Sequence, residues 1–194
     1  MEWGFLFFLN SVLFGVGLAM DAFSVSLANG LNEPKMSARR MELIAGTFAG
    51  FQIGMPLLGW LCVRTLAKAF AAFEKFIPWI ALILLCYIGG KMLWEGLHAS
   101  GEETAPAVSL GALMLQGVAT SIDALSVGFT IADYGTLMAL VEALIIGVVT
   151  FFICIAGLLI GRKFGTKLAG KASVLGGAIL IAIGLEIFIT GLMK

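Results

Sequence analysis

The sequence feature that most constrains the fold is a set of six long apolar segments. They lie near residues 5–29, 41–63, 76–97, 108–131, 136–161 and 173–193. Crossing the ~30 Å hydrocarbon core of a bilayer takes roughly 20 apolar residues in a helix, and each segment is long enough. The charged fraction of 12% is also well below the roughly 25% that is usual in soluble domains. We therefore expect an all-α integral membrane protein with six transmembrane helices in the lipid bilayer.

The two halves of the sequence resemble each other. An offset of 102 residues superposes Asp21 on Asp123, Ser24 on Ser126 and Gly59 on Gly161. This divides the chain into a first three-helix repeat at 1–98, a connecting loop at 99–107 and a second three-helix repeat at 108–194. Because each half has an odd number of spans, the second copy enters the membrane upside down, as in the inverted repeats of many transporters.

The basic residues predict an orientation. Most of them fall at the first, third and fifth connections between the apolar segments: Lys35, Arg39, Arg40, Lys91, Arg162, Lys163, Lys167 and Lys171. Arg64, Lys68 and Lys75 lie on the opposite side and reduce this bias. The positive-inside rule then places both termini outside the cell.

Asp21 and Asp123 are carboxylates inside apolar runs that contain no basic residue. An aspartate in the hydrocarbon region costs roughly 2.5–3.5 kcal/mol on insertion scales, which favours a functional role. Their helical faces carry further oxygen atoms, and the candidate neutral ligands are Ser24, Asn29, Thr120 and Ser126, with Gln116 on the same face as Asp123. Oxygen ligands without nearby His or Cys suit a divalent cation such as Mn²⁺, Mg²⁺ or Ca²⁺. The alternative is that both aspartates are protonated and serve only helix packing.

Two further polar features lie inside apolar segments. Pro56 deprives the Gln52 carbonyl of its helical donor, so Gln52 is a candidate ligand near the membrane midplane, unless the kink serves packing alone. Glu186 is a candidate proton carrier or outer ligand. Glu42 and Glu142, near the starts of the second and fifth segments, are expected in a solvated or helix N-terminal position.

Other features narrow the function classes. The net charge is zero and there is no basic tail, which argues against a nucleic-acid partner. No GxxxxGK[ST] motif is present, so direct ATP drive by this chain is disfavoured, and we expect neither an enzyme nor a cofactor. Glycine stripes at Gly46, Gly50 and Gly54 and at Gly157 and Gly161 predict close helix packing, with a homo-oligomer contact as a further option.

Four motifs in order resemble the MntP family of bacterial manganese exporters. They are the segments 21–30, 51–60, 88–96 and 120–128, which read DAFSVSLANG, FQIGMPLLGW, IGGKMLWEG and TSIDALSVG. The resemblance covers nearly the whole chain. It implies a six-helix inner-membrane protein, grouped with the LysE-type exporters, that expels Mn²⁺. It also implies that Asp21 and Asp123 are the membrane aspartates and that Gly30 closes the first motif, while some members carry an acid at the position of Gln52.

The expected function is therefore Mn²⁺ efflux by a secondary transporter, with alternating access and proton antiport. One alternative is export of another cation, such as Cd²⁺, or of an amino acid on the same scaffold. A second is an intramembrane aspartyl protease, since two carboxylates can share a proton, although Asp123 lacks a GxGD-type context. A third is a substrate-binding subunit of a larger transporter.

Overall fold

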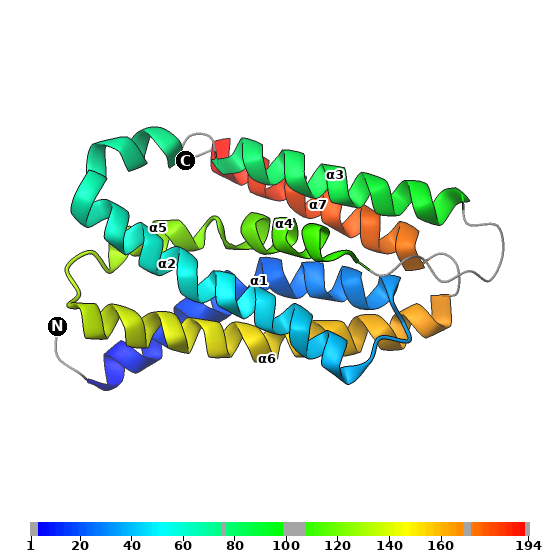
Figure 1. Cartoon of the computed structure of the whole chain (residues 1–194), viewed down its shortest axis with the longest axis horizontal. Helices are drawn as coiled ribbons and strands as arrows, with labels where there is room; N and C mark the ends of the chain where they lie inside the picture. The colour runs from blue at the N-terminus through cyan, green and yellow to red at the C-terminus, as the bar shows by residue number, and fades with distance from the viewer. Residues whose placement is uncertain (1–3, 75–76, 99–107, 169–171, 193–194) are drawn as a thin grey trace.

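Regular structure in the described part of the chain is entirely helical. A computed structural model describes residues 4–74, 77–98, 108–168 and 172–192. Its helices are α1 (Phe5–Asn32), α2 (Ala38–Glu74), α3 (Ile77–His98), α4 (Leu110–Ser121), α5 (Ala124–Thr130), α6 (Thr136–Leu168) and α7 (Ala172–Leu192), as Figure 1 shows. The all-α prediction is confirmed, while the connecting loop expected at 99–107 lies outside the described residues.

Three helices in the described part are long and apolar enough to cross a membrane. They comprise Phe5–Asn32, Ala38–Val63 and Thr136–Phe164. Large apolar side chains point outward along them; on α6, Leu137, Leu144 and Phe152 are more than half exposed. A soluble protein rarely leaves so much apolar surface in water. The chain is a membrane protein, and the count of six spans stays a prediction.

The segment expected as one span at 108–131 is interrupted, so the prediction of a continuous helix is wrong there. α4 ends at Ser121 and α5 begins at Ala124. Near the break, the Thr120 hydroxyl donates to the Gln116 carbonyl at 2.9 Å, and the Ser121 hydroxyl donates to the Gly117 carbonyl at 2.5 Å. Such side-chain bonds compete with the helical ladder. The Asp123 carboxylate then accepts from the Ala124 amide at 2.9 Å, at the start of α5.

The helices pack in pairs of defined direction. α1 runs parallel to α6, because a Cβ on Gly15 would meet Ile146 and a Cβ on Gly30 would meet Leu158. α2 runs parallel to α4 and α5, since Phe51 lies against Gly117 and Gly59 lies against Gly128. α3 and α7 are antiparallel, with close contact between Gly89 and Gly177 and an edge-to-face contact between Trp79 and Phe188 at 4.7 Å.

The predicted glycine stripes have two different outcomes. Gly157 and Gly161 lie directly against the backbone of α1, as close helix packing requires. Gly46, Gly50 and Gly54 have no atom within 4 Å of an added Cβ among the described residues. The prediction of close packing is therefore confirmed on α6, whereas the stripe on α2 has no such contact among the described residues.

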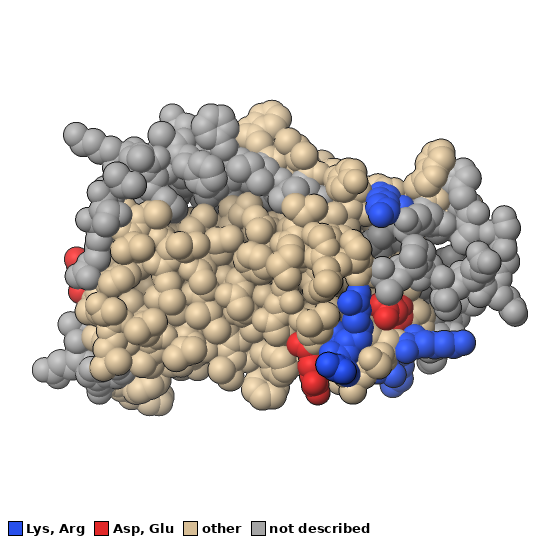
Figure 2. Space-filling view, viewed as in Figure 1, with Lys and Arg blue, Asp and Glu red and all other residues tan. Residues whose placement is uncertain are grey.

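The described basic residues gather at one end of the helix bundle. Figure 2 shows Lys and Arg side chains near the end of α1 and the start of α2. There Arg40 forms an ion pair with Glu33, with Nε 3.6 Å from Oε2. The side chains of Arg64, Lys68 and Lys75, which oppose the charge bias in the sequence, lie outside the described residues.

Candidate functional site

Gln52 on α2 connects the two aspartate-bearing segments. Its side chain is fully buried, and Nε2 donates to the carbonyl oxygens of Leu18 on α1 and Thr120 on α4, at 3.1 Å in each case. Leu18 precedes Asp21 by three residues, and Thr120 precedes Asp123 by three. The offset of 102 residues superposes these two carbonyl positions. One amide therefore joins the equivalent turns of the two halves.

The same amide carries an acceptor without a partner. Gln52 Oε1 is buried and makes no hydrogen bond within the described part of the structure. A buried acceptor left unpaired costs about 1–3 kcal/mol. α2 continues through Pro56 to Glu74. The hydrogen bonds to α1 and α4 are made by the side-chain amide of Gln52, whereas the sequence had drawn attention to its backbone carbonyl as well.

The two aspartates differ in backbone setting. Asp21 lies in the middle of α1 with a partly exposed side chain. Asp123 lies in the break between α4 and α5, where its side chain is exposed and Oδ1 accepts from the Ala124 amide. Non-helical backbone at membrane depth is tolerated where it lines a protein-enclosed or watery cavity, and transporters place ion sites at such broken helices.

Three of the neutral candidate ligands, Ser24, Thr120 and Asn29, make side-chain hydrogen bonds in the structure. The Ser24 hydroxyl donates to the Met20 carbonyl of its own helix at 3.0 Å. The Thr120 hydroxyl is similarly used on α4, and Ser126 lies on α5 with a partly buried side chain. Asn29 is buried eight residues after Asp21 on α1, about 12 Å along the helix, and pairs with Gln116 rather than with a carboxylate.

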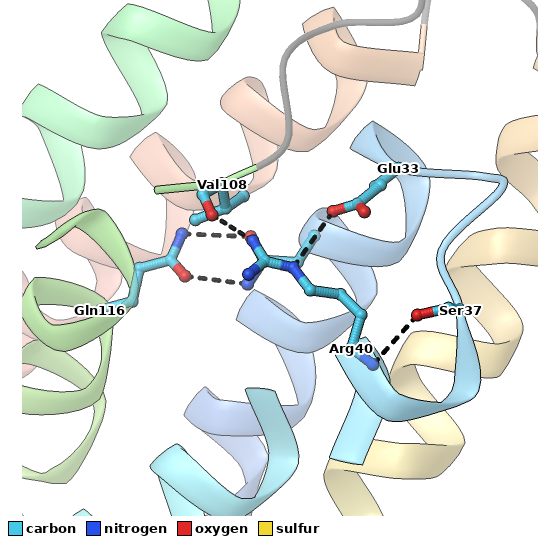
Figure 3. A network of polar contacts seen from close by, with 6 residues as sticks. Glu33, Ser37, Arg40, Val108 and Gln116 are labelled. Atoms are coloured by element: carbon cyan, nitrogen blue, oxygen red, sulfur yellow. Dashed lines mark hydrogen bonds and ion pairs between the residues drawn. The ribbon is translucent and has the colours of Figure 1, made fainter. Parts of the chain in front are cut away.

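Asn29 and Gln116 form a reciprocal amide pair between α1 and α4. Asn29 Nδ2 donates to Gln116 Oε1 at 2.8 Å, and Gln116 Nε2 donates back to Asn29 Oδ1 at 3.1 Å. Both side chains are fully buried, so each satisfies the other. Figure 3 also shows Arg40 on α2, whose guanidinium donates to the Val108 carbonyl and pairs with Glu33. This network closes the end of the bundle where the basic residues gather.

The glutamates that the sequence singled out differ in their exposure to solvent. Glu142 on α6 is 1% exposed, so the expectation of a solvated or helix-terminal position is wrong for it, whereas Glu42 is exposed as expected. Glu142 lies seven residues into α6, far enough for its side chain to be covered by the neighbouring helices. Glu186 belongs to α7, but its side chain lies outside the described residues.

The oxygen atoms of the candidate ligands suit a cation that is bound by only a few charged side chains. Among the described residues, no three His, Cys, Asp or Glu side chains gather in a metal cluster. What the fold offers instead is two aspartates, each three residues after a carbonyl that accepts from Gln52 Nε2, and a buried Gln52 Oε1 without a partner among the described residues. Sequence reasoning missed the Asn29–Gln116 pair and the Arg40 network, because an apolar segment does not show which faces of two helices meet.

Comparison with known proteins identifies the family. A family model described as "Putative manganese efflux pump" matches residues 35–188, which is most of the chain. The chain belongs to the MntP family. A relative from Sorangium cellulosum is 40% identical over 188 residues, covering 94% of this chain and 96% of the relative. One from Clostridium perfringens strain 13 is 40% identical over 211 residues, covering 96% and 97%.

An archaeal relative, from Methanosarcina mazei, is 40% identical over 181 residues and covers 93% of this chain. All three relatives carry the name "Putative manganese efflux pump MntP". The resemblance inferred from the four motifs is thus confirmed, and the family description names a pump rather than an enzyme. No solved structure matches the chain.

Proposed function

We propose that the chain exports Mn²⁺ across the bacterial inner membrane as a secondary transporter, with Asp21 and Asp123 as the principal ligands. The observation that carries the proposal is the placement of Gln52. Its Nε2 bonds the carbonyls that lie three residues before each aspartate, and its Oε1 is a buried acceptor without a partner. The names of the relatives supply the ion, since all three are named for manganese efflux.

The proposal includes six spans arranged as two inverted three-helix repeats. Helix directions support this arrangement, because α1 is parallel to α6, α2 is parallel to α4 and α5, and α3 is antiparallel to α7. α2 and α6 are antiparallel as well, with Ile53 against Gly147 and Met41 near Arg162. Inverted repeats give such opposed directions to equivalent helices, and alternating access then moves one half against the other.

The ligand chemistry favours a hard or borderline divalent ion. Carboxylate and amide oxygens suit Mn²⁺, whereas zinc and copper sites usually recruit His or Cys. In this proposal Gln52 Oε1 is a third ligand of the ion, together with the two aspartates. Ser24, Thr120 and Ser126 lie close along the chain and complete the oxygen set, while Asn29 joins only if its pairing with Gln116 opens.

Orientation and energy coupling complete the proposal. The basic residues of the first and fifth connections lie at the same end of the bundle, which supports a cytoplasmic location for that end and termini outside. Export against a gradient needs an energy source, and a proton entering in exchange for Mn²⁺ supplies it. Glu186 is one candidate proton carrier, and a homo-oligomer through the α2 glycine stripe is a further element of the proposal.

Ion flux in proteoliposomes tests the site. Wild-type protein is expected to move Mn²⁺, and Asp21→Asn and Asp123→Asn are each expected to abolish the flux, because each removes one ligand charge. Asp133→Asn is the matched control, since Asp133 is an exposed aspartate in the α5–α6 connection. Mn²⁺ flux retained in both site variants would exclude these ligands, and transport of Cd²⁺ or an amino acid without Mn²⁺ would exclude the substrate.

A further inference from the structure

Glu142 is a buried carboxyl group that the proposed ion site does not use. Its side chain is 1% exposed, and Oε2 has no hydrogen-bond partner within the described part of the structure. Removing an unpaired carboxylate from water is so costly that the group normally keeps its proton instead. A buried acid of this kind needs a reason to be present, because a leucine would occupy the same place at no such cost.

The surroundings of Glu142 are apolar. Ala139 and Ile146 lie one turn before and after it on the same face of α6. Both belong to a buried cluster that further contains Trp60, Val127 and Ile131, with Phe14, Leu18 and Leu57 packed against it. The apolar side chains of this cluster come from α1, α2, α5, α6 and the α5–α6 connection.

Tyr134 is the titratable group that interacts with Glu142 in the described part of the chain. Burial, and then the negative charge of Glu142, raise the pKa of Tyr134. The Trp60 indole donates to the Tyr134 carbonyl at 3.1 Å, and the Tyr134 ring lies 6.0 Å from that of Phe7. These contacts hold the α5–α6 connection in place beside Glu142, at the end of the bundle opposite Arg40.

A lone carboxyl in an apolar cluster is a poor metal site. Mn²⁺ and similar ions take about six oxygen ligands, and the cluster offers two from Glu142 and the phenol of Tyr134. The repeat offset of 102 residues superposes Glu142 on Arg40. Arg40 closes its own end of the bundle with an ion pair and a bond to Val108, whereas Glu142 makes no such bond. A proton, unlike a metal ion, can be bound by the Glu142 carboxylate without further protein ligands.

We propose that Glu142 binds and releases the proton that is exchanged for Mn²⁺. Because the Glu142 side chain is buried, the end of the bundle at the α5–α6 connection, here called the Tyr134 end, closes only when Glu142 is protonated. This inference rests on the proposed Mn²⁺ export. With the Tyr134 end open, water reaches the carboxylate, and an oxygen lone pair forms an O–H bond with a proton. The neutral acid is then buried at little cost, so this end closes. On release the O–H bond breaks, its electron pair stays on the carboxylate, and water entering from the opposite end accepts the proton.

The coupling follows from the cost of burying charge. Loss of the proton leaves a carboxylate that is unfavourable in the apolar cluster, so the equilibrium shifts toward the form in which this end is open and hydrated. Proton uptake reverses the shift. Proton binding and the open–closed equilibrium are therefore linked, as an exchanger requires.

The test compares Glu142→Gln with Glu42→Gln in proteoliposomes that carry a pH-sensitive dye. Glutamine keeps the shape of the acid and cannot titrate, and Glu42 is an exposed glutamate at the start of α2. In wild type and Glu42→Gln, Mn²⁺ flux is expected to move protons, and one pH unit supports an about tenfold Mn²⁺ gradient for each proton exchanged. In Glu142→Gln, Mn²⁺ is expected to flow only down its own gradient, at a rate independent of pH and without proton movement.

Each outcome decides the inference. Proton movement per Mn²⁺ that is unchanged in Glu142→Gln overturns it. If Glu142→Gln shows no flux, Glu142→Asp decides: coupled flux with a shifted pH profile supports the inference, and equal inactivity of both variants assigns Glu142 a structural role. Wild-type Mn²⁺ flux without proton movement overturns the inference but leaves Mn²⁺ export intact, whereas absence of wild-type Mn²⁺ flux refutes the proposed function itself.

Discussion

Replacing Gly59 by alanine tests the close contact between α2 and α5. A Cβ at this position would lie 2.2 Å from the Leu125 carbonyl oxygen and 3.2 Å from the Cα of Gly128. Both neighbours are backbone, so neither moves aside by rotating a side chain. Since ordinary carbon contacts begin near about 3.5 Å, the two helices must separate by roughly 1 Å. We predict that Gly59→Ala destabilises the protein.

The magnitude follows from three contributions. Overpacking a tight contact costs typically about 1–3 kcal/mol. A gap of roughly 0.5–1 Å also forfeits about a quarter to a half of the dispersion energy along the contact. Against these, alanine favours a helix interior by roughly 0.5–1 kcal/mol over glycine. The expected net loss for Gly59→Ala is about 2–3 kcal/mol in the free energy of unfolding.

Gly54→Ala is the matched control on the same helix. No atom of the described residues lies within 4 Å of a Cβ at Gly54, so only the helix-propensity gain remains. The measurement is unfolding in detergent micelles, followed by the circular dichroism of the helices. The two variants should differ by about 3 kcal/mol, which is roughly two orders of magnitude in the unfolding equilibrium constant. Finding Gly59→Ala as stable as Gly54→Ala would refute the packing of α2 against α5.

Two further predictions concern buried polar groups. Asn29→Ala leaves the buried amide of Gln116 without a partner and is expected to lower the free energy of unfolding by about 1–3 kcal/mol. Replacing both Asn29 and Gln116 by leucine is expected to cost less, because no unpaired partner remains. Additive losses in a double-mutant cycle would contradict the pairing. The pKa of Tyr134 is raised in the folded protein, so on raising the pH the unfolded chain loses the phenol proton first, near the ordinary pKa of 10.0. The free energy of unfolding of the wild type is therefore expected to fall as the pH rises above that value. Tyr134→Phe should weaken this fall. A pH profile of unfolding in Tyr134→Phe that equals the wild-type profile would argue against the burial of Tyr134.

The helices could be predicted because their signal is local. An apolar run long enough to span a bilayer specifies a helix wherever it packs, and the expected boundaries agree with α1, α3 and α7 within a few residues. The break at Asp123 was missed, since hydropathy does not register the polar side chains of Thr120, Ser121 and Asp123, which hydrogen-bond to backbone groups around it. Gly46 and Gly161 carry the same small-residue signal, but within the described part of the chain Gly161 meets another helix and Gly46 does not.

The sequence by itself determined that the chain is a helical membrane protein of the MntP family, and it singled out Asp21, Asp123 and Gln52 as polar groups in apolar segments. Length, hydropathy and motif order are properties of the chain read in one dimension, so they need no knowledge of packing. Only the tertiary structure decided that Gln52 bonds the turns before both aspartates and that Glu142 is buried, with its Oε2 unpaired among the described residues. Burial and hydrogen bonding depend on which faces of distant helices meet, and in an almost uniformly apolar segment no face is marked in advance.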